Sequence, residues 1–324
     1  MSPSGALLAH LVPDAPARQL WRVEGRHRAR FLHAMTTAEV QKRTPGECGF
    51  ACVMTANGKH AGQLRFEVEA NAILLSGDAA GLESALQVLA KHRIADDVRW
   101  HLDPLGDATS SVALVGTGDG ADLAALVAGL VGEAPPAGAW RDLAWQGTPL
   151  RASAFRTAES ELARPTCLVR LSRDAAGAFL DAACGAGAER ADASRWDLLR
   201  IHAGWPQDGV DLAGDDSTIA SERLVATISE TKGCFLGQEV FVMARDLGQT
   251  PRRLVRIELP DEASATSAPT SSVLTTPDGT PVGRIGSRQG SSALAIVKRK
   301  HAVPETLLSI LGGGAARVVP FATT

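Results

Sequence analysis

Hydrophobic and charged residues follow two different periods along the first part of the chain. Leu82, Leu86 and Leu89 recur at helical spacing, which predicts a helix over residues 79–92. Between residues 63 and 68 apolar and polar side chains alternate, which is typical of a strand with one face in the core and the other in water. Both periods within one stretch predict an α+β unit.

The neighbouring residues extend this unit. Patterns of the same two kinds predict strands at residues 20–24, 50–54 and 72–75 and a short helix at residues 28–35. An apolar run near the start of the chain is short and is interrupted by His10 and Pro13, so no signal peptide is expected.

A second stretch repeats the same order of elements. It predicts strands at 111–115, near Trp140, near Leu150 and at 166–171, and helices at 121–131, 174–184 and around 196–203. Two α+β units side by side are therefore expected.

The last part of the chain has a strand pattern only. Residues 253–259 and 293–298 are the clearest strands, which predicts a small β domain at the end. The expected domain ranges are 1–110 and 111–245, two units that interleave, followed by 246–324.

Composition excludes several classes of protein. The 324 residues are 45% hydrophobic and 21% charged, which is typical of a globular protein and not of a disordered one. A formal net charge of -3 gives no general attraction to nucleic acid or to anionic lipid. We therefore expect no direct nucleic-acid binding. No stretch approaches the roughly 20 apolar residues that span a bilayer, so we expect no membrane protein either.

Cysteine usage points to a reducing compartment. The five cysteines are an odd number scattered over a long chain, which does not resemble a disulfide framework. Cys48 and Cys52 have C-x3-C spacing without a second pair nearby, so we interpret them as core thiols and expect no metal site. A cytoplasmic location fits this usage.

The octet K-G-C-F-L-G-Q-E at residues 232–239 sets Cys234 between a lysine and a turn that should open a helix. Half ionisation of an ordinary thiol at pH 7 needs about 2 kcal/mol, whereas a helix N-terminus supplies roughly 0.3–1 kcal/mol. A reactive Cys234 therefore needs a second positive group, for which Lys232 and Arg245 are the candidates. The alternative is a small, half-buried and inert cysteine.

The pattern K-G-C-[aromatic]-x-G-Q-E resembles the YgfZ family of folate-binding proteins. These are relatives of the glycine-cleavage T-protein, and members of the family support iron-sulfur proteins and, through them, tRNA thiolation. The resemblance implies two ferredoxin-like α+β units and a small C-terminal β-barrel around a central channel. It also implies tetrahydrofolate, or a one-carbon derivative, as cofactor and iron-sulfur client or assembly proteins as partners; we expect a monomer.

The resemblance extends to candidate folate contacts. Residues 200–204 look like the family's R-x-E-A-G turn, which brings in Arg200, and residues 218–222 look like its T-x-P-x-E stretch. His202 stands where the family commonly has a glutamate, and an imidazole cannot give a pterin the bidentate grip of a carboxylate. Either pterin affinity is weaker here or Glu222 takes over. The alternatives are a helix-end histidine and a surface carboxylate. Gln238 of the octet is a further candidate.

The first unit carries two more candidates. T-protein relatives use an aspartate on the second strand of this unit to orient the amine that is attacked, and Gln63 stands in the corresponding stretch here. Since an amide cannot act as a base, aminomethyl transfer of the T-protein type is disfavoured. Lys59, in a turn similar to the family's x-x-G-[KR], could reach a folate carboxylate or be an exposed turn lysine.

One motif suggests another ligand. Residues 116–121 follow a strand, precede a helix and satisfy G-x-G-x-x-A, as in dinucleotide-binding proteins. No acidic residue follows at a convincing distance, and Asp119 as a helix cap explains the same residues.

The resemblance therefore implies a folate-binding accessory protein that supports iron-sulfur cluster assembly or repair in client enzymes, including tRNA-modifying enzymes, through a functional Cys234. Independent turnover is left open, and its absence is the favoured expectation. The alternatives are a folate-dependent aminomethyl or methyl transferase and an interaction scaffold without ligand.

Overall fold

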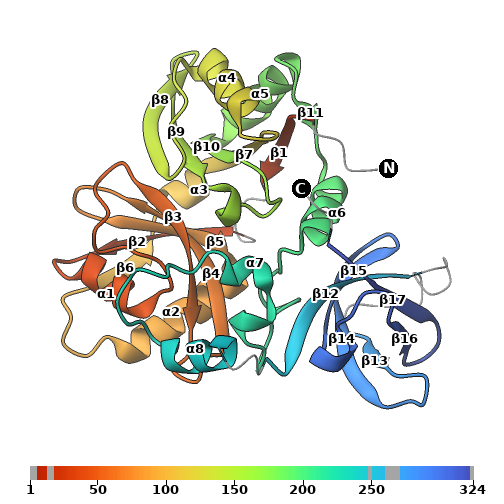
Figure 1. Cartoon of the computed structure of the whole chain (residues 1–324). Helices are drawn as coiled ribbons and strands as arrows, with labels where there is room; N and C mark the ends of the chain where they lie inside the picture. Colours follow the sequence, from red (N-terminus) through yellow and green to blue (C-terminus); the bar gives the residue numbers. More distant parts are fainter. Residues whose placement is uncertain (1–5, 13–17, 247–249, 260–270, 322–324) are drawn as a thin grey trace. The chain divides into compact units, whose positions relative to one another are not determined.

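The computed structural model in Figure 1 describes residues 6–12, 18–246, 250–259 and 271–321. It confirms the expected fold class, because it contains two mixed or antiparallel sheets with helices and a closed barrel formed by the C-terminal strands. The chain forms two compact units, each assembled from separate stretches of sequence. The first comprises 1–53, 61–193 and 227–235, and the second 54–60, 194–226 and 236–324. The domain ranges 1–110, 111–245 and 246–324 stay a prediction.

One sheet of the first unit has the strand order β3-β4-β5-β2-β6. Its elements are β2 (Arg18–Glu24), α1 (Arg28–Met35), β3 (Cys48–Met54), β4 (His60–Val68), β5 (Ile73–Asp78), α2 (Ala79–His92) and β6 (Arg99–Leu102). Helix α2 has the predicted bounds, and its regularly spaced leucines are buried because they form the face that packs on the sheet. At Gly62 a side chain is excluded, since a Cβ atom would lie 2.1 Å from the carbonyl oxygen of Gly81.

The second sheet of this unit has the order β11-β1-β7-β10-β9-β8. Its elements are β1 (Leu8–Val12), α3 (Leu105–Ala108), β7 (Thr109–Val115), α4 (Ala121–Val131), β8 (Ala139–Trp145), β9 (Thr148–Phe155), the 3-10 helix η1 (Thr157–Glu159), β10 (Thr166–Ser172), α5 (Arg173–Gly185) and β11 (Glu189–Arg190). Leu126 and Phe179, from α4 and α5, join one apolar core with Leu114 and Val169 from the strands. Both helices therefore cover the same face of the sheet (Figure 1).

The apolar run near the start of the chain is strand β1. It pairs antiparallel with β7, with Leu8 opposite Val115, and parallel with β11. The His10 ring that interrupts the run is buried, and its Nδ1 is 2.7 Å from the carbonyl oxygen of Ala191.

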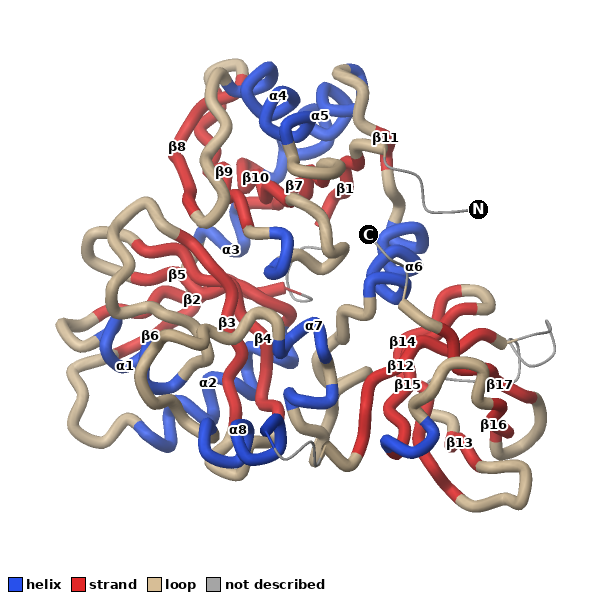
Figure 2. The backbone as a smooth tube through the Cα atoms, in the orientation of Figure 1, coloured by secondary structure: helices blue, strands red, loops and turns tan. Residues whose placement is uncertain are grey.

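The C-terminal strands of the second unit form a closed barrel in the order β12-β15-β14-β13-β16-β17. The bounds are β12 (Arg252–Glu258), β13 (Val273–Thr275), β14 (Pro281–Gln289), β15 (Ser292–Lys298), the 3-10 helix η3 (Arg299–His301), β16 (Leu307–Ile310) and β17 (Ala315–Val319). Inward-facing side chains such as Ile257, Ile285 and Val318 fill it. Outside the barrel lie α6 (Ala193–Ala203), η2 (Thr218–Ala220), α7 (Glu222–Val225) and α8 (Gln238–Asp246), shown as helical segments in Figure 2.

One expectation about β4 is wrong. Its charged face was expected in water, but Arg65 is 8% exposed and Glu67 is 7% exposed. Arginine side chains from β9 and β10 of the second sheet meet this face and neutralise its carboxylate. No helix among the described residues is long and apolar enough to cross a membrane.

Candidate functional site

The segment that carries the first half of the octet is fixed to the core of the first unit. The backbone N–H of Ser229 donates to the carbonyl of Thr37 at 3.1 Å, just after α1. Thr37 is in turn bound to β3, because its N–H donates to the Cys52 carbonyl at 3.0 Å and its hydroxyl accepts from the Cys52 N–H at 2.8 Å. The segment is therefore anchored before the octet begins.

Lys232 is the next anchor. Its ammonium donates to the carbonyls of Thr36 at 2.5 Å and Ala38 at 2.9 Å, and also to the carbonyl of His33. These oxygens lie in the last turn of α1 and just beyond it, where helical carbonyls lack intrahelical partners and the helix dipole favours a cation. Lys232 thus caps the C-terminal end of α1 from a distant part of the chain.

Burial governs the ionisation of this lysine. Lys232 is 7% exposed, and its burial lowers the pKa of the ammonium to about 8, against the opposing effect of the Glu39 carboxylate. The ring of buried Phe235 lies beside it, with its centroid 5.1 Å from Nζ, which allows a cation–π contact. The charge is therefore held by neutral carbonyl groups and an aromatic face.

Cys234 lies between these two buried residues and is itself exposed, as is Gly233. The pair forms a two-residue tip. Within the described residues of the first unit, no hydrogen bond or ion pair involves the Cys234 side chain, and the Lys232 ammonium is directed to carbonyl oxygens. Stabilisation of a Cys234 thiolate by Lys232 therefore stays a prediction without a contact to support it.

The other four cysteines differ from Cys234. Cys48 and Cys52 are buried, as predicted for core thiols. Cys167 is also buried, and Cys184 is half-buried. Burial raises the pKa of the Cys167 thiol to about 12 and raises the pKa of Cys48 as well. Cys234 is thus the one exposed thiol of the five.

The second half of the octet belongs to the second unit and opens a helix, as predicted. Gly237 has φ of 78°, and a Cβ atom there would lie 2.5 Å from the carbonyl oxygen of Thr55. Gln238, half-buried, is the first residue of α8. Arg245 at the other end of α8 pairs with Asp246 at 2.8 Å, so its role as a partner of Cys234 remains a prediction.

The candidate folate contacts on α6 form hydrogen bonds with other residues of the second unit. Arg200 is buried, and its guanidinium donates to the Trp205 carbonyl at 2.8 Å and to the Asp211 carboxylate at 3.2 Å. His202 lies on the same helix, with Nε2 3.1 Å from the hydroxyl of Ser292. Burial, followed by the nearby charge of Arg256, lowers the pKa of this histidine, which favours neutral imidazole.

The remaining candidate folate contacts are Glu222, Lys59 and Gln63, and all three lie outside α6. Glu222 begins α7, is exposed and pairs with Arg253. Lys59 donates to the Asp215 carbonyl at 2.6 Å. Gln63, half-buried in the first unit, shares one face of β4 with Arg65 and Glu67 by strand alternation.

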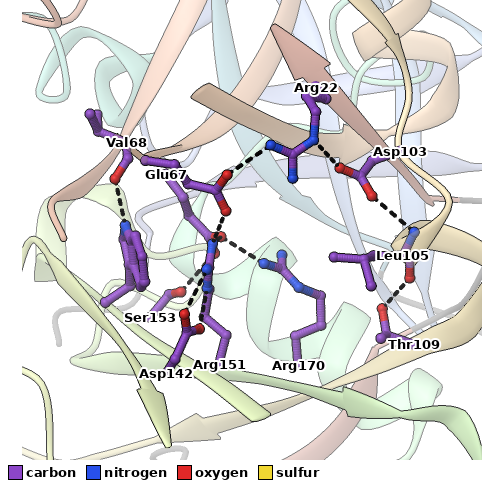
Figure 3. A network of polar contacts seen from close by, with 12 residues as sticks. Arg22, Glu67, Val68, Asp103, Leu105, Thr109, Asp142, Arg151, Ser153 and Arg170 are labelled. Atoms are coloured by element: carbon purple, nitrogen blue, oxygen red, sulfur yellow. Dashed lines mark hydrogen bonds and ion pairs between the residues drawn. The ribbon is translucent and has the colours of Figure 1, made fainter. Parts of the chain in front are cut away.

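Sequence reasoning missed a buried ionic network between the two sheets of the first unit (Figure 3). The Glu67 carboxylate accepts from Arg170 at 2.7 Å and from the Ser153 hydroxyl at 2.7 Å, and it lies 3.3 Å from Arg151. Although burial opposes ionisation, Arg170 and Arg151 hold the pKa of Glu67 below its ordinary value. The available signal was three charged residues, at 65, 67 and 69, on one face of a strand whose other face is apolar.

The network continues on both sides of Glu67. Arg151 also donates to Glu69 at 2.8 Å and pairs with Asp142 at 2.7 Å, while its guanidinium carbon lies 3.6 Å from the centroid of the Trp140 ring. Glu69 in turn accepts from Arg22 at 2.8 Å. Each charge therefore has an opposite charge in contact.

A cavity of about 70 Å³ with a mixed polar and apolar lining borders this network. It is lined by residues of both sheets and of the α3 region: Val12, Arg18, Gln19, Leu20, Glu67, Ser76, Gly106, Thr109, Ser110, Ser111, Phe155, Leu168 and Arg170. It has room for several water molecules or for one small polar group.

The dinucleotide-like motif has a local explanation. The Asp122 carboxylate accepts from the N–H of Thr117 at 3.0 Å and from the N–H of Leu123 at 2.7 Å. It therefore takes up amides that a phosphate would need at this turn. Asp119 accepts from the N–H of Ala121 at 3.1 Å, but the N-cap residue of α4 is Gly120, so the expectation that Asp119 itself caps the helix is wrong.

Comparisons with known proteins agree with this architecture. Residues 252–322 match the family described as "CAF17, C-terminal beta-barrel domain". A crystal structure of the glycine cleavage system aminomethyltransferase T from Bartonella henselae superposes with a TM-score of 0.72 at 17% identity, over 98% of this chain and 86% of that one. The chain has the T-protein fold. The T-protein-like fold that the resemblance implied is therefore confirmed, while the assignment to the YgfZ family stays a prediction.

One curated relative is similar over most of the chain. It is the Arabidopsis thaliana protein named "Putative transferase, chloroplastic", which is 26% identical over 288 residues. The matched region is 87% of this T-protein-like chain and 63% of the relative. The chain therefore spans less than two thirds of the length of this relative.

Proposed function

We propose that this protein is a folate-binding accessory protein that acts through Cys234 and supports the assembly or repair of iron-sulfur clusters in client enzymes, including enzymes that modify tRNA. One observation carries the proposal. The single exposed cysteine lies at a two-residue tip between buried Lys232 and buried Phe235. A thiol held in this way is accessible to a large partner while its position stays fixed. The octet and the T-protein fold support the same proposal.

The chemistry of one exposed thiol suits a transient contact. A thiolate is both a nucleophile and a soft metal ligand. Among the residues that the structure describes, no three His, Cys, Asp or Glu side chains are grouped as metal ligands. Cys234 would therefore offer one ligand, or one nucleophile, to a cluster or an oxidised group that the client carries.

Tetrahydrofolate would supply a carrier for one-carbon groups. A folate needs acceptors for its pterin N–H groups and cations for its carboxylates. Gln63 offers an amide that both donates and accepts, on the face of β4 that Glu67 shares. Arg18 and Arg170 line the neighbouring cavity and carry the required charge. These residues fit parts of a folate, and the cavity volume fits a part of the ligand only.

The main alternative is a folate-dependent transferase. It is favoured by the aminomethyltransferase fold and by the Arabidopsis relative, whose name describes it as a transferase. It is disfavoured by Gln63, because an amide cannot hold an ammonium by charge or accept its proton. Formation of methylene-tetrahydrofolate by the purified protein with an amine donor would favour this alternative.

The proposal is tested in cells that lack the protein. A Cys234→Ser variant should fail to restore the activity of cluster-dependent enzymes, since serine is neither a soft ligand nor a comparable nucleophile. Cys184→Ser, at the half-buried cysteine of α5, is the matched control and should restore activity fully. Full activity with Cys234→Ser would contradict a functional thiol. Calorimetry with tetrahydrofolate separately tests the cofactor, and no binding at high micromolar ligand would favour the scaffold alternative.

A further inference from the structure

The cavity between the two sheets of the first unit contains more hydrogen-bond donors than its own acceptors can use. Arg18 at the start of β2 and Arg170 in β10 are the two cations that line it. A guanidinium carries five N–H donors. Of the ten in this pair, the described residues take up one, through the bond from Arg170 to Glu67 at 2.7 Å.

Arg18 has counterions nearby but no side-chain hydrogen bond to another residue that the structure describes. Its side chain is 22% exposed, with Nε 3.8 Å from the Asp78 carboxylate and a terminal nitrogen 3.7 Å from Glu161. Both distances exceed those of a protein hydrogen bond. Glu161 is moreover engaged with Arg65 at 2.7 Å. These carboxylates keep the guanidinium in place while leaving its donors available.

The carboxylate that lines the cavity already accepts hydrogen bonds from other side chains of the protein. Glu67, the one carboxylate in the lining, accepts from Ser153 through one oxygen and from Arg170 through the other. Ser76 and Ser111 add two hydroxyl groups that have no hydrogen-bond partner among the described residues, and each can donate. A group that enters the cavity therefore finds several free donors, and the acceptors it finds are chiefly hydroxyl oxygens.

We propose that this cavity is a carboxylate-binding subsite in which Arg18 is the principal donor. A carboxylate accepts through two oxygens in the plane that a guanidinium fork matches. The volume of about 70 Å³ suits one such group and not a whole cofactor. Phe155 and Leu168 line the same cavity and provide apolar contacts for the carbon chain that carries the carboxylate. The ligand class is thus a small organic acid, or the acidic end of a larger ligand.

This inference deepens the proposed function and rests on it where the ligand is folate, because Arg18 and Arg170 are the cations proposed there for the folate carboxylates. If the protein binds folate, the glutamate carboxylates of the folate are the group with the required chemistry. If it does not, the same donors still select a carboxylate. The two ideas can therefore fail separately.

The test compares Arg18→Gln with Arg26→Gln, a control at an arginine whose side chain is 77% exposed. Calorimetry with p-aminobenzoylglutamate, which has the carboxylates of folate without its pterin, should show at least a tenfold weaker affinity for Arg18→Gln and no change for Arg26→Gln. Ser111→Ala should weaken binding about threefold. Because Arg170 neutralises buried Glu67, its replacement is avoided.

Each outcome bears on the proposal. No binding of p-aminobenzoylglutamate to the wild-type protein, or equal binding by folded Arg18→Gln, overturns it. Inorganic phosphate that binds more tightly than this ligand overturns the assignment to carboxylates. Tetrahydrofolate bound equally well by the wild type and Arg18→Gln overturns the subsite and leaves the proposed cofactor intact. Arg18-dependent binding of p-aminobenzoylglutamate without binding of tetrahydrofolate supports the subsite and contradicts the cofactor.

Discussion

The first unit buries positive charge in two different ways. At Lys232 the ammonium is surrounded by three backbone carbonyls and an aromatic ring. At Arg151 the guanidinium is in contact with the carboxylates of Asp142, Glu67 and Glu69. Neutral dipoles satisfy the first cation, and opposite charges satisfy the second.

The difference determines how firmly each charge is held. Burial lowers the pKa of Lys232 to about 8, because the carbonyls compensate only part of the lost hydration. Burial also opposes the charge of Arg151, but the neighbouring carboxylates raise its pKa above the ordinary value. The network around Glu67 therefore stays ionised at any physiological pH, whereas the anchor beside Cys234 can lose its proton slightly above neutrality.

The largest effect is expected from breaking the network. Replacing buried Glu67 by Gln keeps the shape of the side chain but leaves half-buried Arg170 without a hydrogen-bonded carboxylate. Loss of one partner from a buried ion pair costs about 3–5 kcal/mol. Urea denaturation should show this decrease in the free energy of unfolding.

Asp181→Asn provides the matched control. Asp181 pairs with Arg190, and both side chains are more than half exposed, at 70% and 53%. An exposed pair contributes about 0–1 kcal/mol. Equal losses for Glu67→Gln and Asp181→Asn would show that the network is not closed to water.

A smaller effect is expected at Lys232. Replacement by Met keeps the apolar stem and removes the donors, so that carbonyls at the end of α1 lose a partner. An unsatisfied buried acceptor costs about 1–3 kcal/mol. Lys42→Met, at a lysine whose side chain is 81% exposed, should change the free energy of unfolding by less than about 0.5 kcal/mol.

The same variant also tests the position of Cys234. Alkylation of Cys234 in Lys232→Met should show altered dependence on the size of the reagent, because the tip loses one of its two buried anchors. An unchanged preference between a small and a bulky maleimide would mean that Phe235 alone fixes the tip.

Local patterns predicted most of the first unit. The helix bounds 28–35, 79–92 and 121–131 agree with the structure, since apolar residues at helical spacing must face a core whatever the rest of the chain does. The barrel was predicted from two strands only. Its short strands β13 and β16, of three and four residues, carry too little periodicity to be identified alone.

The candidate site was harder to predict for a physical reason. Alternation in a strand shows which residues share a face, but it does not show whether water or an opposite charge lies against that face. The partners of Glu67 come from residues 151, 153 and 170, far away in the sequence. Likewise, no local signal shows that Lys232 faces the end of α1, because backbone carbonyls leave no mark in the sequence.

The pH dependence of the Lys232 site gives the smallest and most specific prediction. Between pH 8 and 10.5 the unfolded lysine keeps its proton while the folded one loses it, so the unfolded state binds more protons. The free energy of unfolding contributed by Lys232 should therefore be constant below about pH 8 and should increase with pH above it. The difference between wild type and Lys232→Met, measured by denaturation at pH 7, 8, 9 and 10, isolates this contribution from other titrating groups. A difference that decreases with pH would show that the carbonyls stabilise the ammonium more than burial destabilises it. Neutral carbonyl groups would then hold a buried cation as carboxylates hold Arg151, with a pKa above its ordinary value.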